Sequence, residues 1–233
     1  LTDTLTITKN DGSAARHISI SCSTDELACD ESNLCYMAAQ AFFSRTGMRR
    51  YSVAIHIEKR IPIAAGLAGG STDAAATLIG LDRLYGTGLT TEELCGIGKR
   101  IGADVPFCVR RGISVTRGIG EIMSPCGRLP DCAILIACEG ERVPTPWAYR
   151  MVDEMKERTG QETMSVDRFT SLLSEKRGIE DIASGMRNIF EDAVLPHRER
   201  ARELFQMMEQ TGAIRVMMSG SGPSVFGVYR DMR

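Results

Sequence analysis

Alternating and helical apolar spacings mark four elements in the first sixty residues of the chain. Apolar and polar residues alternate over residues 4–9, 17–22 and 51–57, which predicts three β-strands. Between the second and third of these, apolar side chains recur at helical spacing over residues 33–45 and predict a helix. The first two strands are joined by Asn10-Asp11-Gly12, whose Asp-Gly pair is a strong turn signal.

The middle of the chain predicts two consecutive helices followed by strands. The first helix covers residues 71–85 and ends near Gly86. The second begins at Thr90, where Thr90-x-x-Glu93 has the spacing of a capping box, and continues to about residue 100. A strand-rich stretch follows over residues 108–116, and residues 132–138 form an apolar run that predicts a buried strand.

Beyond Pro144 the pattern becomes helical and then closes with two strands. Helical spacing covers residues 145–156, 166–174, 179–195 and 198–210. Strands are predicted at residues 213–218 and 224–229, joined by the glycine-rich turn of residues 219–223. This order predicts a two-part α+β protein with a boundary near residues 139–145, giving domains over residues 1–140 and 141–233.

Residues 61–76 have a pattern of their own, in which a glycine run passes directly into a strong helix-former run. Gly66, Gly69 and Gly70 can adopt positive φ and let the backbone approach an anion closely. The helix that follows points its free N–H groups at the same place, so the stretch predicts a phosphate cradle. No lysine follows the glycines, and their spacing differs from the dinucleotide fingerprint. The alternative is a helix with a glycine-rich N-terminal cap.

Composition narrows the class of protein. The 233 residues are 43% hydrophobic and 25% charged, which is ordinary globular composition. A net charge of −2 argues against holding nucleic acid or an anionic membrane by bulk electrostatics, so any phosphate must be bound locally. The eight cysteines never form C-x-x-C, which indicates reduced thiols, and no apolar run reaches the roughly eighteen residues of a membrane span. These features predict an intracellular protein.

A phosphate cradle suggests nucleotide-dependent transfer, which needs a carboxylate to orient the acceptor hydroxyl. Asp104 is the best candidate, because it follows glycine-alanine and precedes a Val-Pro pair that stiffens the turn. The alternative for Asp104 is a turn aspartate that hydrogen-bonds its own backbone.

Five segments together resemble one family. Pro62-x-x-x-Gly66-Leu67-x-Gly69-Gly70-Ser71-Thr72-Asp73 resembles the second motif of the GHMP kinases. Residues 33–34, 102–107, 118–122 and 218–227 agree with the same family, in the family's order and over nearly the whole chain. The resemblance implies a two-domain GHMP kinase fold of the α+β class. Its N-terminal part would be ribosomal protein S5 domain 2-like and its C-terminal part ferredoxin-like.

The resemblance also implies roles for individual residues. Asp104 would be the general base, or would orient the acceptor hydroxyl, and Ser71 would lie near a magnesium ion. Residues that would bind ATP are Asn33, Lys59, Pro62, Ala65, Gly66, Leu67, Ala68, Gly69, Gly70, Ser71 and Thr72. Residues that would bind the acceptor are Asp104, Ile119, Gly120, Thr145, Tyr149, Gly220, Ser221 and Gly222. Tyr149 could stack on a cytosine ring.

The branch of the family that it resembles most phosphorylates the 2-hydroxyl of a cytidine diphosphate-linked methylerythritol in the non-mevalonate route to isoprenoid precursors. The implied cofactors are ATP and Mg²⁺. The implied partner is this small molecule, with neither nucleic acid nor membrane, in a monomer or weak homodimer of the bacterial cytoplasm, or of a plastid in a plant. Alternatives are a mevalonate or homoserine kinase type, distinguished by the acceptor, and a non-catalytic nucleotide-binding member.

The family's first motif, a strand with an active-site lysine, would precede Leu1, so the chain resembles one cut at its N-terminus and lacking the first strands. A lysine near the aspartate would stabilise the ionised carboxylate and the charge of the transferred group. The gene upstream of Leu1 distinguishes a catalytic member from a non-catalytic one.

Overall fold

The computed structural model describes residues 1–10, 16–118, 120, 122–138, 142–160 and 166–231. By the density of its internal packing the chain divides into two compact units. The first contains Leu1–Ile63 and Ala68–Ser124, and the second contains Ala64–Leu67 and Pro125–Arg233. The glycine-rich stretch is therefore shared, because residues 64–67 pack with the second unit while both flanks pack with the first. Each unit is described by itself.

The first unit contains a three-stranded sheet of order β1-β3-β2. Its strands are β1 (Thr4–Lys9), β2 (Arg16–Cys22) and β3 (Tyr51–Glu58). β3 runs antiparallel to β1 and parallel to β2, so the two strands joined by the predicted Asp-Gly turn are not neighbours. Residues 11–15 of that turn lie outside the described residues. β3 takes the central place because its apolar side chains are the most deeply buried of the sheet.

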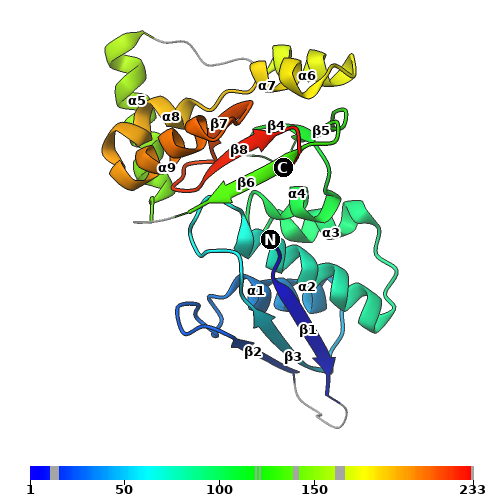
Figure 1. The fold of residues 1–233 in the computed structure, drawn as a ribbon. Helices are drawn as coiled ribbons and strands as arrows, with labels where there is room; N and C mark the ends of the chain where they lie inside the picture. Colours follow the sequence, from blue (N-terminus) through cyan, green and yellow to red (C-terminus); the bar gives the residue numbers. More distant parts are fainter. Residues whose placement is uncertain (11–15, 119, 121, 139–141, 161–165, 232–233) are drawn as a thin grey trace. The chain divides into compact units, whose positions relative to one another are not determined.

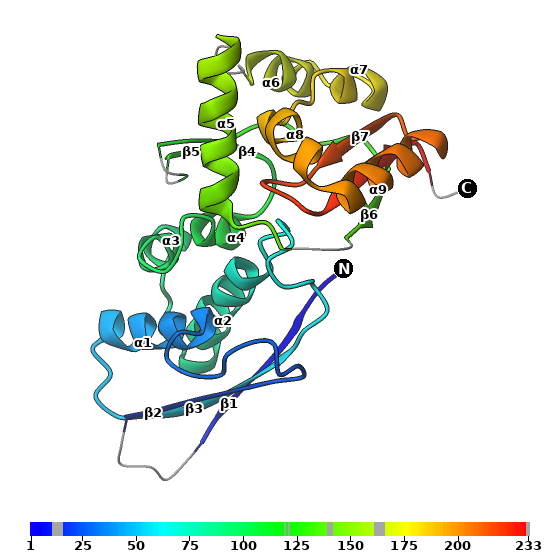
Figure 2. The same cartoon turned by 90° about the vertical axis from the view of Figure 1, so that its left-hand side faces the viewer.

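Two helices, α1 (Leu34–Thr46) and α2 (Gly69–Tyr85), lie on one face of this sheet, as Figure 2 shows. Their inward faces supply Phe42, Phe43, Leu78 and Leu81, all essentially inaccessible to solvent, to a single core shared with β3. Packing of the two helices on the sheet therefore fixes where α2 begins, at the end of the glycine-rich stretch.

The rest of the first unit comprises α3 (Thr91–Gly98), α4 (Val105–Arg110), β4 (Ser114–Arg117) and β5 (Ile122–Pro125), the last two forming a two-stranded sheet. The predicted capping box is confirmed, with Thr90 and Glu93 side chains each bonded to the other's backbone. The predicted strand-rich stretch over residues 108–116 is wrong at its start, because a helix occupies residues 105–110. Pro106 suits the first turn of a helix, where its missing N–H has no helical partner to lose.

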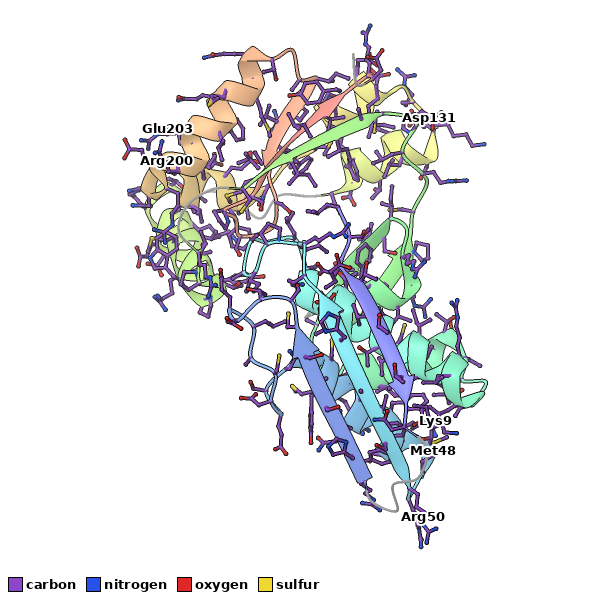
Figure 3. All side chains as sticks on the ribbon, turned by 60° about the horizontal axis from the view of Figure 1, so that its bottom comes forward. Lys9, Met48, Arg50, Asp131, Arg200 and Glu203 are labelled. Carbon is purple, nitrogen blue, oxygen red and sulfur yellow. The ribbon has the colours of Figure 1, made fainter. Side chains whose placement is uncertain are left out.

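The second unit contains an antiparallel sheet of order β6-β8-β7 with helices packed on it (Figure 1). Its elements are β6 (Ala133–Ala137), α5 (Thr145–Thr159), α6 (Asp167–Ser174), α7 (Ile179–Ser184), α8 (Ile189–Val194), a 3₁₀ turn (Leu195–His197), α9 (Glu199–Gln210), β7 (Arg215–Met218) and β8 (Val225–Tyr229). β7 and β8 form the predicted hairpin, with Met218 opposite Val225. α9 presents an exposed ion pair between Arg200 and Glu203 (Figure 3), whose charged atoms lie 2.7 Å apart.

Two expectations for this part of the chain change. β6 is not buried, since Ile134, Leu135 and Ile136 are 48%, 46% and 41% exposed, and among the described strands it pairs with β8 alone. By internal packing the compact units divide after Ser124, which places β6 with its partner β8, and the domain bounds 1–140 and 141–233 stay a prediction. The helical pattern over residues 179–195 is interrupted between α7 and α8, where Asn188 is extended.

Candidate active site

The N-terminus of α2 has the geometry of an anion site. Ala68, at φ 51°, turns the chain into the helix, and the N–H of Thr72 makes the first helical hydrogen bond, to the Ala68 carbonyl at 2.9 Å. By helix geometry the N–H groups of Gly69, Gly70 and Ser71 have no acceptor inside the helix, so they can donate to phosphate oxygens. The helix begins two residues earlier than its predicted start, which places Ser71 in its first turn.

A side chain would not fit at the first residue of α2. A Cβ on Gly69 would lie 2.9 Å from Ile61 Cγ2 and 3.1 Å from Lys59 Nζ. The side chains of Ile61 and Lys59 therefore pack directly against the start of the helix, and a side chain at Gly69 would have to displace them.

Lys59 belongs to a buried cluster of charges beneath this point. Its Nζ lies 2.5 Å from Asp3 Oδ2 and 2.8 Å from Asp73 Oδ2, and its side chain is only 6% exposed. Asp3 also accepts hydrogen bonds from the backbone N–H groups of Arg60 and Ile61. The cluster ties the residue before the glycine stretch to the helix after it.

The two carboxyls of this cluster titrate in opposite directions. Burial raises the pKa of Asp73 to about 6, although the hydrogen bond from Lys59 opposes the shift. Burial also acts to raise the pKa of Asp3, but the hydrogen bonds from Lys59 and from two backbone N–H groups hold it below its usual value. The predicted contact of Lys59 with ATP stays a prediction, and its ammonium is engaged by these carboxylates.

Asp104 lies at the N-terminus of α4, and its carboxylate makes no capping hydrogen bond. The Asp104 carbonyl accepts from the N–H of Cys108 at 3.1 Å, and Cys108 Sγ lies 4.0 Å from Thr72 Oγ1. Since Cys108 is one helical turn from Asp104, α4 sets this carboxylate beside the first turn of α2. Asp104 is exposed, and its carboxylate does not cap α4, so it is accessible to a ligand.

Gly120 lies beside the same turn. An added Cβ at Gly120, whose φ is 109°, would meet the carbonyl oxygen of Ala103 at 3.4 Å, one residue before Asp104. Ile119, predicted with it, lies outside the described residues. The first unit thus brings together the start of α2, Asp104 and Gly120.

In the second unit the two glycine-containing segments touch each other. Ser219 Oγ donates to the Gly66 carbonyl at 2.8 Å, and the N–H of Ser224 donates to the Ala65 carbonyl at 3.3 Å. A Cβ on Gly66, whose φ is 74°, would lie 2.5 Å from the Ser219 carbonyl oxygen. Two segments about 150 residues apart therefore pack with no room for a side chain at Gly66.

Two other residues predicted to bind the acceptor, Thr145 and Tyr149, belong to the second unit. Thr145, the first residue of α5, places its Oγ1 3.5 Å from Ser221 Oγ. One turn later Tyr149 is 58% exposed, and its ring meets that of Phe190 edge-on at 5.1 Å. An aromatic ring with more than half of its residue exposed can stack on a ligand ring.

The structure does not show how the remaining residues predicted to bind ATP would contact it. Asn33 is buried as the N-cap of α1, where its amide bonds the N–H of Cys35 and the carbonyl of Ala28. Pro62 is exposed and Leu67 is partly buried. For Asn33, Pro62 and Leu67 the predicted contact with ATP stays a prediction.

Sequence reasoning missed several residues that hold these segments in place. They are Asp3, Cys108, Phe190, Asn188, Glu191 and Ser219. Asn188 carries only a weak signal: asparagine is a common N-cap, but here it lies within the helical pattern of residues 179–195. The others carry none, since their partners are distant in sequence.

The donor chemistry fits a magnesium-nucleotide complex. Ser71 in the first turn of α2 and Asp104 beside it supply hard oxygen atoms, which Mg²⁺ prefers. Within the described ranges, no group of three histidine, cysteine, aspartate or glutamate side chains is placed to hold a metal ion. No described helix is long and apolar enough to span a membrane.

Comparison with known proteins identifies the family. The GHMP kinases N terminal domain matches residues 33–112, and the GHMP kinases C terminal domain matches residues 171–233. The 4-diphosphocytidyl-2-C-methyl-D-erythritol kinase of Gloeobacter violaceus is 40% identical over 99% of this chain and 75% of its own length. The chain belongs to the GHMP kinase family. The corresponding enzyme of Alkaliphilus metalliredigens is 39% identical to this GHMP kinase over 92% of the chain and 72% of its own length.

Solved GHMP kinase structures agree. A crystal structure of 4-(cytidine 5'-diphospho)-2C-methyl-D-erythritol kinase superposes with a TM-score of 0.75 at 30% identity, over 97% of this chain and 76% of the other. Homoserine kinase from Cytophaga hutchinsonii superposes with a TM-score of 0.78 at 19% identity, over 99% of this chain and 77% of the other, and shares the fold alone. The predicted two-domain GHMP kinase fold is confirmed, and the protein is an ATP-dependent small-molecule kinase.

Proposed function

We propose that this GHMP kinase transfers the γ-phosphoryl group of ATP to the 2-hydroxyl of 4-diphosphocytidyl-2-C-methyl-D-erythritol. Relatives at 40% and 39% identity carry the name of that activity. The observation that carries the residue assignment is the contact between Thr72 and Cys108. Through it, a free carboxylate, Asp104, lies beside the helix N-terminus that suits a phosphate group.

The glycine stretch would hold the nucleotide phosphates. The free N–H groups of Gly69, Gly70 and Ser71 are aimed by the start of α2, and the helix dipole favours negative charge there. Bound Mg²⁺ would neutralise charge on the β- and γ-phosphates. Ser71 is the residue proposed to lie next to this ion.

Asp104 would orient the acceptor hydroxyl and accept its proton as the phosphoryl group moves. In phosphoryl transfer the protein contributes chiefly position and charge stabilisation, so a carboxylate held in line is sufficient for this role. Gly120, beside the same turn, has a φ of 109°, a backbone conformation that favours glycine.

The cytidine end of the acceptor would be held by Thr145, Tyr149 and the turn of residues 220–222. The exposed Tyr149 ring suits stacking on a pyrimidine, and the hydroxyls of Thr145 and Ser221 offer hydrogen bonds close to one another. We further propose Asn33 and Lys59 for the adenine side. Cytoplasmic location, or a plastid in a plant, and a monomer or weak homodimer complete the proposal.

An acceptor panel tests the function. The full-length protein is incubated with Mg-ATP and 4-diphosphocytidyl-2-C-methylerythritol, mevalonate or homoserine, and ADP release and the phosphorylated product are measured. Turnover on the cytidine-linked acceptor alone is expected. Preference for mevalonate or homoserine would reassign the substrate, and nucleotide binding with no turnover on any acceptor would indicate a non-catalytic member.

A further inference from the structure

The first turn of α8 holds the backbone on both sides of Ser219. Asn188 Nδ2 donates to the carbonyls of Met218 at 2.8 Å and Gly220 at 2.9 Å. Glu191 Oε1 accepts from the N–H of Met218 at 2.8 Å. Two side chains of one short helix thus make three hydrogen bonds to the start of the second glycine turn.

The Asn188 amide has one orientation that satisfies all its neighbours. Its Oδ1 accepts from the N–H of Phe190 at 3.0 Å, which caps α8, while both N–H bonds of Nδ2 go to carbonyls that can only accept. Asn188 therefore performs two separable tasks, the cap of α8 and the attachment of the turn. Only an amide of this length performs both.

The attachment continues to the first glycine segment. Ser219, between the two carbonyls that Asn188 holds, donates to the Gly66 carbonyl at 2.8 Å. The Ser219 carbonyl oxygen would lie 2.5 Å from a Cβ on Gly66, so the two backbones pack closely at this point. All these residues belong to the second compact unit.

Glu191 is partly buried where it accepts the hydrogen bond from Met218. Burial raises the pKa of its carboxyl, and the hydrogen bond from Met218 only partly offsets that shift. The spacing Asn188-x-x-Glu191 is that of a capping box, yet Glu191 reaches across to β7 instead of to the Asn188 backbone.

We propose that Asn188 and Glu191 are positioning residues that hold the turn of residues 219–222, and through Ser219 the backbone of residues 65–66, in the conformation that binds nucleotide and acceptor. The proposal rests on the proposed function, which assigns those two segments to binding. Neither side chain need touch a substrate for this role.

Substitution of Asn188 by serine separates its two tasks. Asn188→Ser keeps a good N-cap for α8 but lacks the two N–H donors that reach Met218 and Gly220. We expect KM for ATP and for the acceptor to rise about tenfold, the effect of losing roughly one net hydrogen bond, with kcat close to wild type and a melting temperature lower by a few degrees. Glu191→Gln, which keeps an acceptor oxygen for Met218, should retain near-wild-type KM, whereas Glu191→Leu should behave like Asn188→Ser.

Amide hydrogen exchange in the unliganded protein gives a second readout that needs no activity. Exchange at residues 66 and 218–222 should rise about tenfold or more in Asn188→Ser, because opening of the turn costs less free energy. Thr90→Ala is the matched control, since it removes the cap of α3 in the other unit and should lower the melting temperature without changing either KM.

Each outcome decides the proposal. If Asn188→Ser leaves exchange or both KM values at wild-type level, Asn188 is only a helix cap and the proposal is wrong. If Thr90→Ala raises KM as much as Asn188→Ser does, the effect is general destabilisation and the proposal is again wrong. Absence of turnover in the wild-type protein would overturn the proposed function, while exchange would still show whether Asn188 holds the turn.

Discussion

The carboxylate of Asp104 can serve a ligand because it makes no hydrogen bond to the helix that it precedes. It sits at a helix N-terminus, where aspartate commonly caps the helix, but its side chain makes no cap hydrogen bond. The carboxylate is thus free to meet an acceptor hydroxyl beside the first turn of α2.

Replacing Asp104 by asparagine should reduce kcat about 10²- to 10⁴-fold, the usual contribution of a positioned acid or base, with little change in KM for ATP. Steady-state kinetics of the full-length protein measure this. Glu203→Gln, which removes a carboxylate from the exposed ion pair of α9, is the charge control and should leave kcat unchanged. Near-normal turnover of Asp104→Asn would remove this residue from the mechanism.

Asp73 gives a pH signature to the buried cluster with Lys59 and Asp3. Its folded pKa is raised to about 6, so the folded state retains a proton that the unfolded state loses near pH 4. This contribution to stability is present below pH 4 and is lost as pH rises through 6.

Asp73→Asn should therefore remove a falling segment from the pH profile of stability. We expect the free energy of unfolding of the wild type to decline relative to Asp73→Asn between about pH 4 and pH 6 and then to level off. Denaturant unfolding at a series of pH values tests this. Parallel profiles for the two proteins would show that Asp73 titrates normally.

At the scale of elements, the two glycine segments pack so closely that a side chain at Gly66 is excluded. Gly66 has no room for a Cβ and has a positive φ, whereas Gly86, at the end of α2, has a positive φ but no heavy atom within 4 Å of a Cβ. Alanine at Gly86 would therefore suffer backbone strain alone, whereas alanine at Gly66 would suffer both backbone strain and a steric clash.

Gly66→Ala should raise KM for ATP more than tenfold, because a methyl group 2.5 Å from the Ser219 carbonyl must displace one of the two segments. Gly86→Ala should cost only about 1–2 kcal/mol of stability, for the left-handed backbone, and should leave KM unchanged. Kinetics and thermal unfolding of both variants decide the matter. Equal KM values in both would mean that the contact with Ser219 has no part in binding.

Some elements were predictable from the local sequence pattern. The capping box at Thr90 and the β7-β8 hairpin follow from residues close in sequence, and both are confirmed. The neighbour of β1 was not predictable in this way. The long connection from β2 allows β3 to enter between them, and burial of the most apolar strand favours that order.

For the whole molecule, ligand binding should appear as added stability. With ATP at about 100 times its Kd, mass action gives about 2.7 kcal/mol to the folded state, measured as a rise in melting temperature. Asp104→Asn should show the same rise, because it keeps the phosphate-binding backbone, while Gly66→Ala should show a smaller one. A rise in wild type that persists in full in Gly66→Ala would place ATP elsewhere.

The sequence by itself determined the chemistry that a continuous stretch can carry. Residues 61–72 show a glycine cradle, Asp104 shows a carboxylate in a stiff turn, and the order of such segments shows the family. These signals are local because helix starts and tight turns depend on residues a few positions apart.

Only the tertiary structure decided which distant residues hold those segments in place. Asn188 and Glu191 reach Met218 from 30 and 27 residues away, and Ser219 reaches Gly66 across 153 residues. Asp3 meets Lys59 across 56 residues. Such pairings arise when packing of apolar faces brings separate elements together, and no periodicity along the chain records which side chains then meet.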